Sequence, residues 1–200
     1  KQLNFIQHIK TLLKVNGKCA VVVPDNILFE SGSGEIIRRK LLEQCNVHTI
    51  LRLPTGIFYA GGVRANVLFF DKKPAREDGK SWTEKIWIYD LRTNMHFTQK
   101  VKKMKRSDLD EFVKCYNAAD ITKRKENTQD EERRWRSYTY DEIIERDKTS
   151  LDIFWLKDDS LIDLENLPEP DVMVEEISDN LESALESITD LKKNLNSTRS

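Results

Sequence analysis

The sequence is poor in cysteine, glycine and proline, and it has no long hydrophobic run. Its 200 residues include three cysteines, seven glycines and five prolines. The odd number of cysteines, with no Cys-x-x-Cys pair, excludes a disulfide framework and is typical of a reduced intracellular protein, so we expect a cytoplasmic location. No apolar stretch approaches the roughly 18 residues that a membrane-spanning helix needs, so no membrane partner is expected.

Residue patterns that carry metal or nucleophile chemistry are also scarce. His8, His48 and His96 are scattered, and no His/Cys pair has ligand spacing, so no metal site is predicted. No Gly-x-Ser-x-Gly elbow occurs, and Gly32-Ser33-Gly34 lacks the further residues of a dinucleotide fingerprint or a P-loop. The net charge of −1 does not by itself demand a nucleic-acid partner. We predict no catalytic residue in this chain.

Residues 1–92 alternate between helical and strand patterns, which predicts an α/β sheet. The expected elements are a helix that ends before Gly17, a strand at 19–24, a helix at 35–44 with Ser33 as N-cap, and strands at 47–53, 66–70 and 86–90. The apolar run at 19–24 predicts a strand buried on both faces of a parallel sheet. The linker between Leu53 and Asn66 is too short for a helical crossover, so the strands on either side of it should be antiparallel neighbours.

Residues 93–170 differ from the part before them and predict a helical and loop extension. Apolar side chains between 109 and 116 predict a helix, whereas the charge-dense stretch 120–137 predicts a solvated loop or linker. Thr139 and Glu142 have the spacing of a capping box ahead of another short helix. The apolar and aromatic run at 151–156 indicates a packed segment.

The last segment, 171–200, has the clearest periodicity in the chain. Its apolar residues are spaced alternately three and four apart, as in the heptad seam of a coiled coil: Val174, Ile177, Leu181, Ala184, Ile188, Leu191 and Leu195. Between Asp171 and Asp190 there are seven acidic residues and no basic one, a charge that would repel an identical parallel helix. We expect this helix to dock on a different chain, with docking on its own body as the alternative.

Two features of the middle of the chain are candidates for nucleic-acid contact. Phe58 and Tyr59 lie in a glycine-containing loop between two strands, where a ring could stack on a base; packing within the protein is the alternative. The run 100–106 has five basic residues, including Lys102 and Lys103, and no acidic one. It could neutralise phosphates, with a solvated charge run as the alternative.

Six short blocks occur in a characteristic order: Ala20 to Phe29, Ile37 to Leu42, Leu53 to Phe58, Arg64 to Phe70, Trp87 to Arg92 and Leu151 to Leu156. In this order they resemble the C-terminal half of the modification (methylation) subunit of type I restriction–modification systems. The resemblance implies an N6-adenine DNA methyltransferase that uses S-adenosylmethionine. It also implies a doubly wound, Rossmann-like sheet whose last strands, here 47–53 and 66–71, form an antiparallel hairpin before a mostly helical tail.

The same resemblance implies site residues and partners. Phe58, with Tyr59 as second choice, matches the position of the ring that stacks on the flipped adenine, and Arg64 would contact a backbone phosphate. The segment 171–195 would dock on the specificity subunit, which reads the DNA sequence. DNA, the restriction subunit and a second modification subunit are the other expected partners.

The sequence departs from this family in the parts that carry the chemistry. The glycine-rich cofactor loop and the Asn-Pro-Pro-Phe/Tyr tetrapeptide that holds the target amine are absent, since none of the five prolines follows an asparagine. The exocyclic amine of adenine is a poor nucleophile unless it is hydrogen-bonded and positioned, so we expect the isolated chain to be inactive. We interpret the chain as part of a longer protein, whose incomplete sheet would expose an edge and an apolar face.

Two other functions fit the residues. One is a non-catalytic α/β interaction module that presents a coiled-coil arm, because no catalytic constellation is visible in the 200 residues. The other is a stand-alone adenine methyltransferase with its own target-recognition region.

Overall fold

The computed structural model describes residues 2–60, 62–126 and 133–157, together with helical positions between 174 and 189. Lys1–Lys157 form one compact unit and Asp158–Ser200 a second, so each is described by itself. The expected boundaries at 92 and 170 stay a prediction. In the part of the chain that is described, no helix is both long and apolar enough to cross a membrane.

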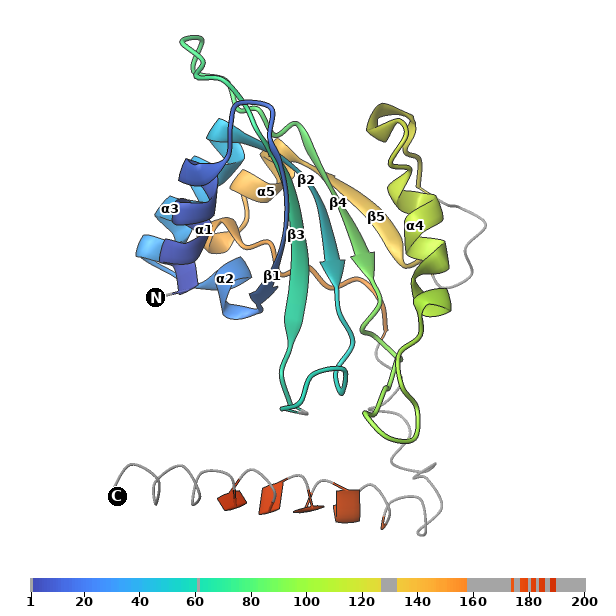
Figure 1. The fold of residues 1–200 in the computed structure, drawn as a ribbon. Coiled ribbons are helices and arrows are strands. Elements are labelled where there is room, and N and C mark those ends of the chain that lie inside the picture. The colour runs from blue at the N-terminus through green and yellow to red at the C-terminus, as the bar shows by residue number, and fades with distance from the viewer. Residues whose placement is uncertain are drawn as a thin grey trace, which may run out of the picture. The chain divides into compact units, whose positions relative to one another are not determined.

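A five-stranded mixed sheet forms the centre of the first unit (Figure 1). Its spatial order is β1-β3-β2-β4-β5, and the strands are β1 (Lys18–Pro24), β2 (Cys45–Arg52), β3 (Ala65–Lys72), β4 (Lys85–Asp90) and β5 (Trp135–Thr139). β3 is antiparallel to both β1 and β2, β4 is parallel to β2, and β5 is antiparallel to β4. The predicted antiparallel pairing of β2 with β3 is therefore confirmed, and the carboxyl ends of β1, β2 and β4 meet at one edge of the sheet.

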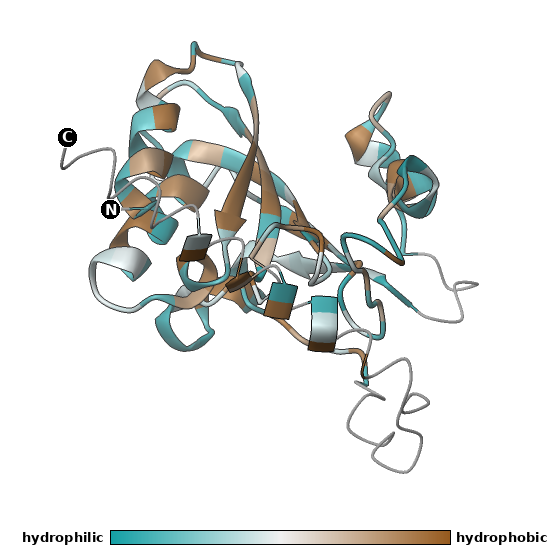
Figure 2. Ribbon diagram, turned by 60° about the horizontal axis from the view of Figure 1, so that its bottom comes forward, coloured by the Kyte–Doolittle hydropathy of each residue, from teal (hydrophilic) through white to brown (hydrophobic). Residues whose placement is uncertain are grey.

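Helices cover the two faces of the sheet unequally. The helices are α1 (Gln2–Leu12), α2 (Asn26–Phe29), α3 (Ser33–Gln44), α4 (Asp110–Tyr116) and α5 (Tyr140–Ile144), with 3-10 turns at Arg106–Leu109, Ile121–Lys123 and Asp147–Thr149. One hydrophobic cluster joins α1, α2, α3 and α5 to residues such as Ile50 and Leu68, and a second joins α4 to Leu51 and Tyr89. Neighbouring strand residues thus enter different clusters, because side chains alternate across a strand. Figure 2 shows how hydrophobic the central strands are.

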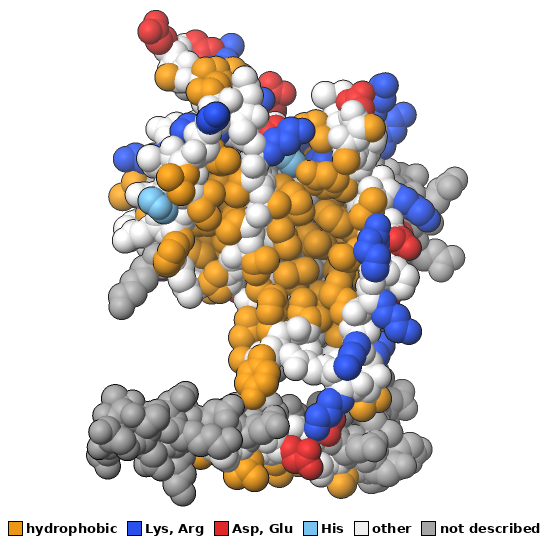
Figure 3. Space-filling model, in the orientation of Figure 1, with side chains coloured by type: hydrophobic (Ala, Val, Ile, Leu, Met, Phe, Trp, Pro, Cys, Tyr) orange, Lys and Arg blue, Asp and Glu red, His pale blue; other side chains and the backbone are white. Residues whose placement is uncertain are grey.

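The strand at 19–24 is not buried on both faces, contrary to expectation. Among the described residues β1 pairs only with β3, so it lies at an edge of the sheet and its exposure alternates along its length. Val22 is 55% exposed. Figure 3 shows hydrophobic side chains gathered over the strands on the side of the sheet that it displays. The expected exposed edge and apolar face are therefore present in the described part.

The charged stretch 120–137 is only partly the solvated loop that was expected. It ends in β5, where Trp135 is 2% exposed and stacks on Trp87 with ring centroids 5.0 Å apart. A single buried ring in a charge-dense sequence is a weak strand pattern, and this strand was not predicted. The capping box of Thr139 and Glu142 is confirmed, whereas Gly32, not Ser33, occupies the N-cap of α3.

In the second unit, every described position is helical. These positions include five of the seven seam residues, Val174, Ile177, Leu181, Ala184 and Ile188, all of which are exposed. Leu191 and Leu195 lie outside the described residues. The heptad seam and its docking role stay predictions.

Candidate nucleic-acid interface

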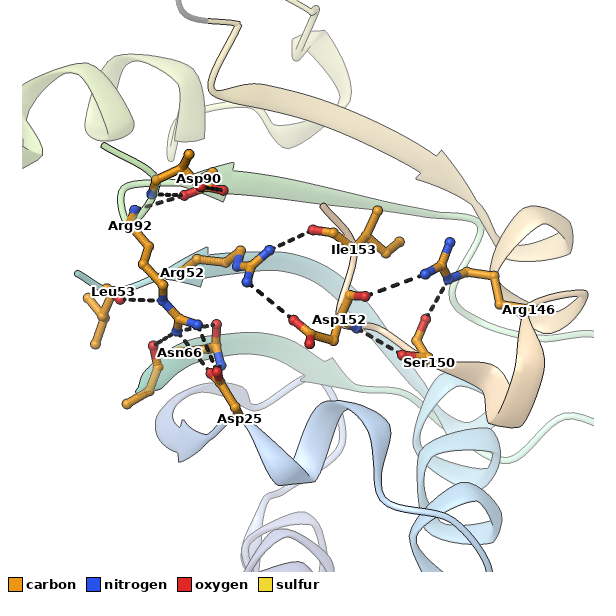
Figure 4. A network of polar contacts seen from close by, with 12 residues as sticks. Asp25, Arg52, Leu53, Asn66, Asp90, Arg92, Arg146, Ser150, Asp152 and Ile153 are labelled. Atoms are coloured by element: carbon orange, nitrogen blue, oxygen red, sulfur yellow. Dashed lines mark hydrogen bonds and ion pairs between the residues drawn. The ribbon is translucent and has the colours of Figure 1, made fainter. Parts of the chain in front are cut away.

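Polar side chains gather at the edge where β1, β2 and β4 end (Figure 4). Asp25 follows β1, Arg52 is the last residue of β2, and Asp90 is the last residue of β4. Asn66, near the start of the antiparallel β3, joins them because β3 begins at this edge. In open α/β sheets, ligands bind outside the carboxyl ends of the strands, so this edge is the candidate site.

Arg92 is at the centre of the first group of contacts. Its guanidinium forms a bidentate ion pair with Asp25, with Nη1 and Nη2 at 2.7 and 2.9 Å from the two carboxylate oxygens. Asn66 donates a third hydrogen bond to the same carboxylate at 2.8 Å. Burial alone raises the pKa of Asp25, but the hydrogen bonds and charge of Arg92 outweigh it and lower the pKa overall. Asp25 therefore stays ionised and bonded to Arg92 and Asn66.

The turn that carries Arg92 is itself held by buried polar groups. Asp90 is 1% exposed, and its Oδ1 accepts hydrogen bonds from the backbone N–H groups of Arg92 and Thr93, each at 2.8 Å. Arg134 donates to the carbonyl oxygens of Asp90 and Thr93, also at 2.8 Å. These bonds fix the backbone from which the Arg92 side chain extends.

Arg52 links the same edge to the segment after α5. Its side chain is 2% exposed, its Nη1 donates to the carbonyl oxygen of Ile153 at 2.7 Å, and its Nη2 lies 3.3 Å from Oδ1 of Asp152. The ring of Phe154 covers the guanidinium at 3.9 Å. Burial lowers the pKa of Arg52 and raises that of Asp152. The apolar run at 151–156 thus packs against the sheet, as its composition indicated.

The loop 54–64 emerges from this edge and carries three of the predicted DNA contacts. Phe58 is half-buried at the border of the second hydrophobic cluster, whereas Tyr59 is 61% exposed and Arg64 is exposed. Phe58 therefore lies at the border of the core. One part of its surface packs against the second hydrophobic cluster, and another part faces outward. The base-stacking role of Phe58 or Tyr59 and the phosphate contact of Arg64 stay predictions.

The segment just before the basic run 100–106 lies directly against this loop. Gly56 has φ +79°, and a Cβ at this position would stand 1.8 Å from the carbonyl oxygen of Phe97. Thr55 forms a β-bridge with His96. The Nζ of Lys102 lies 5.6 Å from the Phe97 ring, and the backbone of Lys102 accepts a hydrogen bond from Thr98.

Lys102 and Lys103 are both exposed. Figure 3 shows Lys and Arg side chains gathered over α4 and the segment that leads into it. The ring-bearing loop and the basic run, separate in sequence, therefore adjoin in space. Their contact with DNA stays a prediction.

The arginine–carboxylate network was missed by sequence reasoning. Asp25, Arg52, Asp90 and Arg92 each stand at or just after a strand end, and this placement is the only signal that could have found them. Among the described residues, no group of three or more His, Cys, Asp or Glu could hold a metal ion.

The antiparallel strand β3 lies between the parallel strands β1 and β2, and polar groups stand at their carboxyl edge, so the fold is that of an α/β protein with a mixed sheet. Residues 1–153 match the family model described as N-6 DNA Methylase. The chain belongs to the N-6 DNA methylase family.

Relatives of known type support the same assignment. The chain is 41% identical to the type I restriction enzyme EcoKI methylase subunit of Escherichia coli (strain K12) and, equally, to the StySJI methylase subunit of Salmonella typhimurium (strain LT2). Each match covers 98% of this chain and 42% of the relative, so the chain spans less than half the length of these curated relatives.

Solved structures of the same kind share the fold. The crystal structure of the EcoKI M protein matches with a TM-score of 0.69 at 39% identity, over 98% of this chain and 44% of that one. A modification subunit of a type I restriction enzyme from Vibrio vulnificus YJ016 matches with a TM-score of 0.61 at 27% identity, over 83% of this chain and 34% of that one. The expected fold class is confirmed.

The described residues do not by themselves fit S-adenosylmethionine, the methyl donor that the family implies. Asp25, the carboxylate that follows β1, has its oxygens engaged by Arg92 and Asn66. The sequence also has no glycine-rich loop of the cofactor-binding type. We therefore assign no step of a reaction to the cofactor in this chain.

Proposed function

We propose that this chain is the base-contacting part of a DNA adenine-N6 methyltransferase, the modification subunit of a type I restriction–modification complex that acts in the cytoplasm. The observation that carries the proposal is that the Phe58 loop contacts the backbone of Phe97, whose ring lies beside Lys102 of the basic run, at the carboxyl edge of a methyltransferase sheet. A half-buried ring can receive a flipped base, and exposed lysines beside it can neutralise the strand that the base leaves.

In this proposal the chemical groups come from outside the chain. The main cofactor loops and the tetrapeptide that holds the target amine belong to residues other than these 200, because the sequence contains neither. The partners are DNA, the specificity subunit, the restriction subunit and a second modification subunit. Support for such an assembly comes from a structural relative that was solved to explain complex assembly of the type I R-M system.

The proposal is tested by Phe58→Ala in the full-length modification subunit, assembled with its specificity subunit on cognate DNA. A base–aromatic stack contributes about 1–3 kcal/mol, so single-turnover methyl transfer should slow by roughly 5- to 150-fold. Fluorescence of 2-aminopurine at the target position should rise, since the flipped base loses the ring that quenches it. Phe5→Ala is the matched control, because Phe5 is an exposed ring on α1, which packs on the other face of the sheet.

Wild-type rates and unchanged fluorescence in Phe58→Ala would remove this ring from the pocket. In that case Tyr59→Ala tests the second choice, and a normal rate in both variants rejects the base-contacting role of the loop.

The competing function is a non-catalytic interaction module with a helical arm. The exposed seam residues Ile177 and Leu181, 54% and 66% exposed, favour docking of the arm but do not separate the two functions, since both use it. Methyl transfer by the full-length complex distinguishes them. Turnover that depends on Phe58 supports the methyltransferase, and a complex that shows no turnover supports the module.

A further inference from the structure

We infer that Arg92 is a positioning residue that sets the place of the base-contacting loop 54–64. This inference rests on the proposed function and concerns how the ring of Phe58 is held. Arg92 lies outside the loop, after the end of β4. It acts through the two backbone positions at which the loop leaves and re-enters the sheet.

Arg92 acts at the neck of the loop, which is formed by Leu53 and Ala65. The loop leaves after Leu53 and returns at Ala65, and the two residues are joined by a backbone hydrogen bond from Leu53 N–H to the Ala65 carbonyl at 3.0 Å. Arg92 Nε donates to the Leu53 carbonyl at 2.9 Å, and Nη2 donates to the Ala65 carbonyl at 2.8 Å. One rigid, planar guanidinium therefore clasps both sides of the neck.

The clasp is anchored on a third element. The same guanidinium pairs with Asp25 at the end of β1, and the Asp25 backbone N–H donates to the Arg64 carbonyl at 3.2 Å. The side chain of Arg92 is 11% exposed, so its hydrogen bonds are largely shielded from competing water. The loop is thus tied to β1, β2 and β4 at once, whereas its tip, with Tyr59, is exposed.

Arginine is the residue that this geometry requires. A lysine at 92 keeps a positive charge beside Asp25 but presents one nitrogen, which cannot span the Leu53 and Ala65 carbonyls and the carboxylate together. Arg92→Lys should therefore fold and keep the ion pair while the neck loosens. Arg92→Ala removes both the clasp and the counter-ion of Asp25.

Arg76 supplies a matched control within the chain. It also pairs with an aspartate, Asp78, but it lies in the connection between β3 and β4, at the edge opposite the loop neck. Arg76→Ala removes an arginine–aspartate pair without touching the loop.

The test measures methyl transfer by the full-length subunit, assembled with its specificity subunit, for Arg92→Lys, Arg92→Ala and Arg76→Ala. A misplacement near 1 Å can cost about 100-fold, so we expect the rate to fall by about 10- to 100-fold in both Arg92 variants and to be unchanged in Arg76→Ala. KM for DNA should change little, because the lysines of the basic segment remain. The effect should also be non-additive: in a Phe58→Ala background, Arg92→Lys should cost less than about 2-fold.

Chymotrypsin cleavage after Phe58 and Tyr59, followed by mass spectrometry, reports on the neck without any activity. Both Arg92 variants should be cut here at least about 10 times faster than wild type and Arg76→Ala, at temperatures that keep the protein folded. Cleavage and methylation at wild-type rates in Arg92→Lys, or full additivity with Phe58→Ala, overturns the inference. A wild-type complex that methylates nothing contradicts the proposed function alone, and the cleavage result then still decides the role of Arg92.

Discussion

Substitution of Gly56 by alanine perturbs the loop at one defined contact. A Cβ at Gly56 would lie 1.8 Å from the Phe97 carbonyl oxygen, whereas real Cβ atoms essentially never approach a neighbour closer than 3.0 Å. The difference, 3.0 minus 1.8, is 1.2 Å, and it must be made up by moving backbone, because the obstacle is a main-chain carbonyl. The φ of +79° adds about 1–2 kcal/mol of strain for a residue with a Cβ.

A displacement of this size acts on the ring two residues further along. A shift near 1 Å in a positioning element can cost about 100-fold in rate, so Gly56→Ala should slow single-turnover methyl transfer by about that factor. The measurement uses the full-length subunit with its specificity subunit on cognate DNA, with thermal unfolding as a check on the fold. Stability should fall far less than activity, since the loop contributes to the second hydrophobic cluster only at its border, through Ile57 and Phe58.

Alanine substitutions at Gly79 and Gly62 serve as controls that distinguish backbone strain from a steric clash. Gly79 has φ +69°, and a Cβ there would meet nothing within 4 Å, so Gly79→Ala introduces backbone strain without a clash. Gly62 lies in the same loop as Gly56 and also has open space around it. Both alanine variants should methylate within about 3-fold of wild type, because neither moves the backbone at Phe97. If Gly56→Ala matches them, the contact with Phe97 does not set the loop, and the reasoning is refuted.

Two further predictions concern other parts of the chain. Burial lowers the pKa of His48 to about 4, so the unfolded chain binds a proton more readily than the folded one and stability is lost as the pH falls from about 6.5 to 4. The loss should reach roughly 3 kcal/mol in urea unfolding, and His48→Gln should flatten it; equal slopes in both proteins contradict the assignment. Deletion of 171–200 should abolish co-purification with the specificity subunit while near-native circular dichroism of the remaining body persists, and an intact complex would reject the docking role of the seam.

Local pattern was enough to predict four of the five strands of the sheet and one of their pairings. β2 and β3 are apolar runs joined by a linker too short for a crossover helix, and these two facts leave an antiparallel neighbour as the simplest solution. β1 has the same apolar composition, yet its burial could not be read from the sequence. Whether Val22 faces a neighbour or open space depends on which elements lie beside the strand, and composition does not encode that.

Sequence reasoning could find the loop residues of the candidate site but not the pairing of Arg92 with Asp25. A ring in a glycine-containing loop is a local anomaly, so Phe58 and Tyr59 could be selected without knowledge of the fold. Arg92 and Asp25 are 67 positions apart, and each on its own is an ordinary charged residue after a strand. Their pairing follows from strand order and direction, which place the ends of β1, β2 and β4 together, and a single sequence does not specify that order.

On the proposed function, the two attachments of the loop explain how a half-buried ring can be held ready for a base. An unrestrained loop of about eleven residues has many conformations, and ordering them upon binding would oppose the stacking energy of a single ring. Arg92 restricts the neck through the Leu53 and Ala65 carbonyls, and Phe97 restricts the ascending side at Gly56. Because both restraints act on backbone atoms, the side chain of Phe58 stays available while its origin is fixed. The structure thus places the rigidity of the site in residues that act on the loop and not on the base, and loss of either restraint should lower the rate more than the affinity for DNA.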